Sequence, residues 1–170
     1  MDMQKLRLRE VTVNDGPEGL RFLQDIVNEE GIMVAPAPKD IDASSFPKWL
    51  QAKTDTAKGL NMPEGFVPCT TYWVMLGEKI IGLANIKHEL NDFLRKKGGH
   101  IGLSLAKEYR GRGVGFATAK LLIERARTEF GIDDILMTNE PENIASRKLC
   151  EKLGAELTDI DEHCHYWIRK

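Results

Sequence analysis

"YRGRGVGFATAKLL", residues 109–122, places Gly111, Gly113 and Gly115 at every second position and then continues into a pattern typical of an amphipathic helix. A buried-strand pattern, "HIGLSLA" at 100–106, comes just before it. The order strand, glycine-rich turn and helix presents unpaired backbone N–H groups and the positive end of a helix dipole to a phosphate. A tight turn needs one glycine, so three alternating ones favour a phosphate site.

Two common phosphate motifs do not fit these glycines. The dinucleotide fingerprint GxGxxG would need glycine at 114 or 116, where Val114 and Phe116 stand. The P-loop pattern fails because no Gly-Lys-Ser/Thr follows. The ligand is therefore expected to be a phosphate compound held in another way.

The spacing Arg110-x-x-Gly113-x-Gly115 resembles the pyrophosphate-binding signature (Q/R-x-x-G-x-G/A) of the GCN5-related N-acetyltransferases, the GNAT family. The segment "ENIASRKLCEKLGA" at 142–155 is similar to the family's later helix, with Asn, a small residue, Leu and Gly in order. The resemblance covers roughly 3–170, and "IKHELNDFLRKKGGHIGLSL" at 86–105 resembles a subgroup of predicted acetyltransferases.

The order of elements predicts one domain over 1–170 with an α/β fold of the α+β type. The resemblance implies a mixed, mostly antiparallel central sheet flanked by helices, with splayed central strands. We expect strands at 4–13, on both sides of "GEK" at 77–79, at 100–106, at 132–139 and as a pair within 155–170. We expect helices from Pro17 to Gly31 with Val27 on the apolar face, at 90–97 before Gly98 and Gly99, at 116–130 before Gly131, and at 141–153 before Gly154.

Residues 31–69 show no regular pattern and hold five of the seven prolines, with Phe46, Trp49 and Phe66 between them. Two interpretations stay open. The segment is a surface excursion packed by its own aromatic side chains, or it shapes the substrate side of a binding site, as long irregular segments often do.

Helical spacing predicts which faces of the two later helices turn inward. On the first we expect the core face to hold Phe116, Ala119, Ile123, Ala126 and Phe130. On the second, one stripe holds Asn143, Ser146 and Cys150, and another, expected to pack inward, holds Ala145, Leu149 and Leu153.

The resemblance implies that acetyl-CoA binds as a co-substrate between the splayed strands, with backbone groups of 103–105 against its pantetheine arm and thioester. Amides of 111–116 would surround the pyrophosphate, and we expect Arg110 or Arg112 to contact a phosphate. The expected cofactor-binding residues are Leu103, Ser104, Leu105, Arg110, Gly111, Arg112, Gly113, Val114, Gly115, Phe116, Asn143 and Ser146.

The family's reaction is direct attack of a primary amine on the thioester in a ternary complex. It needs an oxyanion donor, a route for the amine proton and an acid for the departing thiolate. By analogy the N–H of Leu105 is the donor. The family's acid is often a tyrosine seven residues after the asparagine, but here that position is Cys150, which either acts as the acid or only packs. The alternative acids are Tyr109, Tyr166 and a water molecule. A covalent acetyl-cysteine is disfavoured because no adjacent helix residue is a base.

The candidate bases are His88, Glu89 and His100, with a chain of water molecules as the alternative. Neighbouring strand residues point to opposite faces, so at most one of His88 and Glu89 faces a substrate. His163 and His165 flank Cys164, but no further ligand pair stands at a suitable spacing. We therefore expect no metal site and assign both histidines to strand packing.

Composition limits the other functions. The 170 residues are 42% hydrophobic and 29% charged with a formal charge of −2, which is ordinary for a soluble protein and argues against a nucleic-acid partner. The three scattered cysteines fit reduced thiols, and neither a signal peptide nor a membrane-length apolar run is present. These features predict a cytoplasmic protein with no membrane partner.

We therefore expect an acetyltransferase whose acceptor is a small-molecule or peptide amine. The resemblance also allows a homodimer. The alternative is a non-catalytic acyl-CoA-binding sensor or interaction module, which would bind CoA tightly without turnover on any amine. An RNA-binding role for the "RGRG" segment is the weaker third hypothesis, and salt-dependent binding would identify it.

Overall fold

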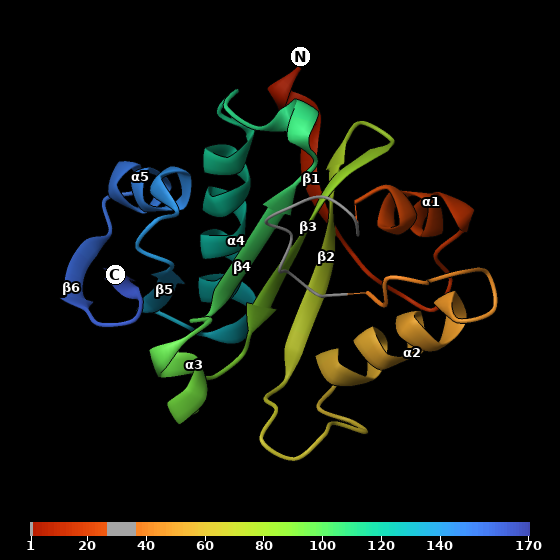
Figure 1. The fold of residues 1–170 in the computed structure, drawn as a ribbon, viewed down its shortest axis with the longest axis horizontal. Helices are drawn as coiled ribbons and strands as arrows, with labels where there is room; N and C mark the ends of the chain where they lie inside the picture. Colours follow the sequence, from red (N-terminus) through yellow and green to blue (C-terminus); the bar gives the residue numbers. More distant parts are fainter. Residues whose placement is uncertain (1, 27–36) are drawn as a thin grey trace.

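The computed structural model describes residues 2–26 and 37–170. Its strands form two sheets, one with the order β1-β2-β3-β4 and one with the order β5-β7-β6, and every strand pair is antiparallel (Figure 1). The strands are β1 Leu6–Glu10, β2 Cys69–Leu76, β3 Lys79–Lys87, β4 Ile101–Leu105, β5 Ile135–Asn139, β6 Glu156–Ile160 and β7 Cys164–Ile168. The helices are α1 Pro17–Ile26, α2 Phe46–Ala57, α3 Asp92–Lys96, α4 Val114–Phe130 and α5 Ile144–Lys152, with 3-10 turns at Met3–Lys5 and Lys107–Tyr109.

Helices cover both faces of the larger sheet (Figure 1). One core lies between this sheet and α4, where Tyr72, Ile86 and Leu122 are buried together. A second core lies on the opposite face, where Trp73 of β2 packs with Trp49 of α2 and Leu23 of α1. The predicted mixed α/β fold with antiparallel sheets flanked by helices is confirmed.

Local sequence signals mark most of the element ends as expected. The "GEK" hairpin turns at Gly77, whose φ of 62° lies in the left-handed region that glycine adopts easily. Helix α4 ends at Gly131 with a φ of 66°. The predicted Gly31 end of the first helix, and Val27 on its face, lie outside the described residues.

The prediction that 31–69 is irregular is wrong for the part of this segment that the structure describes, because α2 occupies Phe46–Ala57. Pro47 lies in the first turn, where a missing N–H leaves no hydrogen bond unmade. Phe46, Trp49 and Leu50, at helical spacing, are buried against the sheet. The proline thus marks the start of a helix, which the high proline content of the segment concealed.

The predicted helix faces also need correction. The buried row of α4 is Val114, Thr118, Leu122 and Ala126 with Ala119, whereas Phe116, Ile123 and Phe130 are only half-buried. This row is hard to recognise in the sequence because Thr118 is polar. Its hydroxyl donates to the carbonyl of Val114 at 2.9 Å, so the side chain can be buried with its hydrogen bond made.

On α5 the inward residue is Cys150, which is 0% exposed. Ala145 is exposed, and Leu149 and Leu153 are half-buried, so the stripe expected to pack inward faces partly outward. The reason is tertiary: Asn139 at the end of β5 contacts α5 on the side that carries Ser146 and Cys150.

The two sheets meet at His100, just before β4. Its backbone N–H donates to the carbonyl of Leu136 on β5 at 2.8 Å, and its Nδ1 accepts from the N–H of Leu136 at 3.0 Å. Beyond this point β4 pairs with β3 and β5 pairs with β7. The predicted splaying of two central strands is therefore confirmed, and His100 lies where they begin to separate.

None of the helices among the described residues combines the length and the apolar character that crossing a bilayer requires.

Candidate active site

A cleft follows the gap between β4 and β5 and has two chambers. The glycine-side chamber, about 540 Å³, reaches from β4 to the turn before α4 and to α5. The histidine-side chamber, about 400 Å³, is lined from β3, β4, β5 and the residues next to β7. The two chambers adjoin, because both are lined by Leu103, Ser104, Asn143, Ser146 and Leu149.

Strand β4 offers half of its backbone to this cleft. In the antiparallel pairing with β3, His100 accepts from the N–H of Lys87 and Ala106 donates to the carbonyl of Ile81. Hydrogen-bonded and open positions alternate along such a pair, so the N–H and C=O groups of Leu103 and Leu105 point away from β3. The backbone of Ser104 pairs with β3 instead, and only its side chain is left to face the cleft.

The glycine turn leaves amides available at the start of α4. Gly111 and Gly113 have φ values of 71° and 80°, a left-handed conformation that costs other residues about 1–2 kcal/mol. Gly113 is the N-cap, no side chain caps the helix, and Ala117 is the residue whose N–H bonds back to Gly113. The N–H groups of the first turn therefore have no partner within the helix and point toward the chamber mouth.

The glycine-side chamber is positively charged. Arg110, Lys148 and Lys152 line it, and no Asp or Glu is among its lining residues in the part of the chain described. The Nε of Arg110 donates to the carbonyl of Leu105 at 2.7 Å, which folds the arginine back toward β4. Sequence reasoning missed Lys148 and Lys152, although their i,i+4 spacing beside the expected asparagine placed both on one helix face.

The structure brings together most residues expected to bind a cofactor. Those lining the glycine-side chamber are Leu103, Ser104, Leu105, Arg110, Gly111, Gly113, Gly115, Phe116, Asn143 and Ser146. Arg112 is exposed and Val114 is fully buried, and neither side chain lines a chamber. Asn143 caps α5 through its Oδ1, which accepts from the N–H of Ser146 at 3.1 Å.

Cys150 lies behind the cleft wall. Its Sγ accepts from Asn139 Nδ2 at 3.2 Å, and burial raises the pKa of the thiol to about 11. The amide oxygen of the same asparagine, Asn139 Oδ1, accepts from the hydroxyl of Ser146, which lines both chambers. Asn139 thus connects a thiol that faces the core to a hydroxyl that faces the cleft.

None of the three expected bases lines the cleft. The imidazole of His100 is buried with its Nδ1 occupied by Leu136, and burial lowers its pKa to about 4. Glu89 is exposed beyond the end of β3. His88 turns to Thr70 and stacks on Phe130, with ring centroids 4.1 Å apart.

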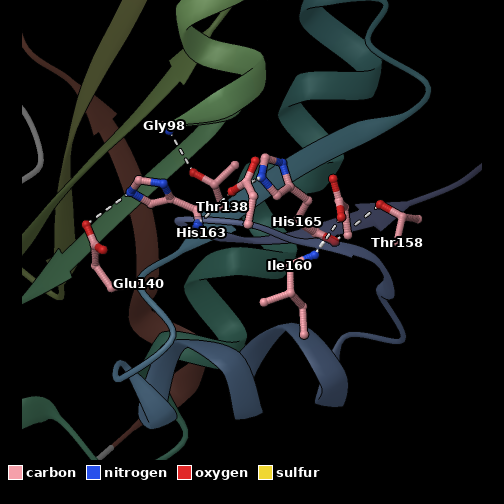
Figure 2. A network of polar contacts seen from close by, with 9 residues as sticks. Gly98, Thr138, Glu140, Thr158, Ile160, His163 and His165 are labelled. Atoms are coloured by element: carbon pink, nitrogen blue, oxygen red, sulfur yellow. Dashed lines mark hydrogen bonds and ion pairs between the residues drawn. The ribbon is translucent and has the colours of Figure 1, made fainter.

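The histidine-side chamber contains a histidine–carboxylate pair. Sequence reasoning assigned His163 to strand packing and did not consider Glu140. His163 Nε2 lies 3.2 Å from Glu140 Oε1 (Figure 2). Lys97 Nζ lies 3.6 Å from the same oxygen. The backbone N–H of His163 donates to Asp161, which also contacts His165 at 3.1 Å. The imidazole rings of His163 and His165 therefore contact different carboxylates, and the described residues contain no group of three ligands that could hold a metal ion.

The same chamber contains the end of β3. Asn85 and Lys87 lie on one face of that strand and both line the chamber, with Lys87 Nζ 3.2 Å from Asn85 Oδ1. Burial lowers the pKa of Lys87, because the ammonium loses hydration. The residues next to Lys87 in the sequence do not mark it as a site residue, because lysines are common at strand ends.

Comparison with known proteins shows which protein family has this sequence pattern and fold. Residues 5–156 match the family model described as the acetyltransferase (GNAT) domain. The structure resembles a crystal structure of a probable acetyltransferase, with a TM-score of 0.71, 16% identity and coverage of 98% of this chain and 94% of that one. No curated protein matches the chain significantly.

Two further solved structures share the fold. The N-acetyltransferase PseH from Campylobacter jejuni, in complex with acetyl coenzyme A, has a TM-score of 0.63 and 13% identity over 97% of this chain and 99% of its own. The spermidine N-acetyltransferase from Vibrio cholerae has a TM-score of 0.66 and 17% identity over 98% of this chain and 94% of its own.

Proposed function

The chain belongs to the GNAT acetyltransferase family, and from that premise we propose that it transfers the acetyl group of acetyl-CoA to a primary amine in a ternary complex. The observation that carries this proposal is the pair of adjoining chambers, one with a basic glycine turn and the other with the His163–Glu140 pair. Two substrates can enter from opposite sides and meet at the shared wall.

Acetyl-CoA fits the glycine-side chamber by charge and by hydrogen bonding. Its pyrophosphate would accept from the first-turn amides of α4 and would be attracted by Arg110, Lys148 and Lys152. The open backbone position of Leu103 would pair with the pantetheine amides, as a further strand would. When bound, acetyl-CoA supplies the activated acyl group.

Two groups at the shared wall suit the reacting thioester. The N–H of Leu105 points into the gap, where it can donate to the oxygen that becomes negative during attack. Ser146 faces both chambers, and its hydroxyl donates to Asn139 Oδ1 in the structure. On departure of the thiolate this hydroxyl would turn to the sulfur, transfer its proton and regain one from water. We assign this acid role to Ser146 and the packing role to Cys150, because Cys150 lines neither chamber.

The proton of the amine goes to His163 in this proposal. Its ring faces Glu140, a carboxylate that orients the imidazole (Figure 2). His100 and Glu89 have no comparable position, since neither lines the cleft. The described side chains therefore favour one proton acceptor on the amine side and one proton donor on the thiolate side.

The proposal is tested by calorimetric titration with acetyl-CoA, CoA and NADH, followed by a thiol-release assay on a panel of amines. We expect selective binding of the two CoA species and turnover on one class of amine. Tight CoA binding without turnover on any amine would favour the acyl-CoA sensor instead. Absence of CoA binding would remove the assignment of the glycine turn.

A further inference from the structure

The chamber assigned to the amine has an unusual balance of charge. Its lining holds two lysines, Lys87 and Lys97, and one carboxylate, Glu140, among the residues described. Glu140 already faces both Lys97 and His163. Lys97 is therefore neutralised locally, and the charge of Lys87 remains.

The contacts of Lys87 leave its charge uncompensated. Its Nζ has a hydrogen bond to the amide oxygen of Asn85, and no carboxylate of residues 2–26 and 37–170 forms an ion pair with it. Beside it is the thiol of Cys69, its partner across the β2–β3 pair. The same thiol is near the ammonium of Lys53 on α2, whose pKa burial also lowers.

A half-buried ammonium that lacks a counter-ion attracts an anion from solution or from a ligand. We propose that the histidine-side chamber takes amines that also carry an anionic group, a carboxylate or a phosphate, and that Lys87 with Asn85 binds this group. This inference rests on the proposed transferase function and names its acceptor class. A polyamine would bring a second cation to a wall that already holds two lysines, so it is disfavoured.

The size of the chamber agrees with this class of acceptor. A volume of about 400 Å³ lies within the range of small-molecule sites and suits a compact amine better than a folded protein terminus. Lys87 and His163 line the same chamber, so one small acceptor can have its anion at the end of β3 and its amine near His163. The anion would fix the orientation of the amine toward the thioester.

The test compares matched pairs of acceptors in the thiol-release assay. The carboxylate pair is alanine with alaninamide, and the phosphate pair is glucosamine 6-phosphate with glucosamine. Spermidine is the cationic probe. We expect the anionic member of at least one pair to have a kcat/KM about 10-fold or more above its neutral partner, and the pair that discriminates identifies the anion.

Lys87→Gln should abolish this preference. We expect kcat/KM for the anionic member to fall about 30-fold, kcat/KM for the neutral member to change less than about 3-fold, and Lys87→Arg to retain most of the preference. Lys96→Gln, which removes a charge from an exposed position of α3, is the matched control and should leave both members unchanged. An unaltered preference in a folded Lys87→Gln protein, or a wild-type preference for the neutral members or spermidine, would overturn the proposal.

A binding measurement separates this inference from the transferase activity. Protein saturated with CoA is titrated calorimetrically with both members of each pair. Stronger binding of the anionic member that is lost in Lys87→Gln supports the subsite even when no amine is acetylated, whereas equal binding of both members overturns it. If Lys87→Gln does not fold, inhibition of wild-type binding of the anionic member by acetate or phosphate replaces the variant, and absence of inhibition counts against the subsite.

Discussion

The two chambers of the cleft are lined by different kinds of chemical group. The glycine-side chamber is made largely of backbone groups from one stretch of chain, Leu103 to Phe116, completed by α5. The histidine-side chamber is made of side chains from β3, the end of α3, β5 and the residues before β7. A backbone site can be recognised from glycine spacing in the sequence, whereas a side-chain site appears only when distant segments are folded together.

The difference also predicts how each chamber responds to mutation. Changes in the histidine-side chamber should act on the chemical step and on the choice of acceptor. Changes in the glycine turn should act on acetyl-CoA affinity, and changes at the junction of the two sheets should act on stability.

The largest effect is expected from His163→Gln. Loss of a general base typically costs at least 100-fold, so kcat/KM for the amine should fall about 100-fold at pH 7. The deficit should shrink at higher pH, where more of the amine is already deprotonated. The pH–rate profiles of wild type and variant provide the measurement.

His165→Gln is the control for this prediction, because His165 contacts Asp161 and lines neither chamber. It should keep its activity to within about 3-fold, well below the effect of a lost base. A pH-independent deficit in His163→Gln would assign His163 to structure rather than to proton transfer.

Ser146→Ala should lower kcat about 30-fold at every pH, because the lost proton goes to the thiolate and not to the amine. Cys150→Ala should leave kcat nearly unchanged and reduce the free energy of unfolding by about 1 kcal/mol, since it removes a buried atom from the core. Steady-state kinetics and urea denaturation of both variants test this contrast. The reverse result would return the acid role to Cys150.

His100 should make the stability of the junction between the sheets depend on pH. In the unfolded chain this residue takes up a proton near pH 6.5, but in the folded protein its pKa is about 4. The unfolded state therefore binds more protons between these values, and stability is lost as the pH falls through this window. We expect about 2 kcal/mol less stability at pH 5 than at pH 7 from this group.

Urea denaturation of wild type and His100→Gln at both pH values measures this contribution as the difference between their pH slopes. Equal slopes would mean that His100 can be protonated in the folded protein.

The smallest effect is expected at the glycine turn. Gly113→Ala and Gly131→Ala lie at the two ends of α4, both at positive φ, and neither added Cβ meets another atom within 4 Å. Each should cost about 1 kcal/mol of stability from backbone strain. Only Gly113→Ala should weaken acetyl-CoA binding, by about 10-fold, because it alters the path of the amides that face the phosphates. Equal affinities of the two variants for acetyl-CoA, measured calorimetrically, would contradict the assignment of the glycine turn to phosphate binding.

The sequence predicted those parts of the molecule that depend on neighbours along the chain. The glycine turn, the "GEK" hairpin and the helix end at Gly131 follow from backbone preferences that a few residues determine. These signals, read in order, also gave the family and the fold class, both of which are confirmed. Pro47 shows the limit, because a helix-starting proline resembles a helix-breaking one until the buried face of α2 is seen.

Only the tertiary structure decided which side chains face the cleft. Cys150 and Ser146 lie on one stripe of α5, and the approach of Asn139 from β5 separates a buried thiol from a hydroxyl at the wall. Glu140 and His163 are 23 residues apart in the chain and become partners through the pairing of β5 with β7. The sequence by itself determined the conformation of the glycine turn, because that conformation depends on residues that are neighbours along the chain. The position of each ionisable side chain depended on packing between strands that are far apart in the chain, so no short stretch of sequence could predict it.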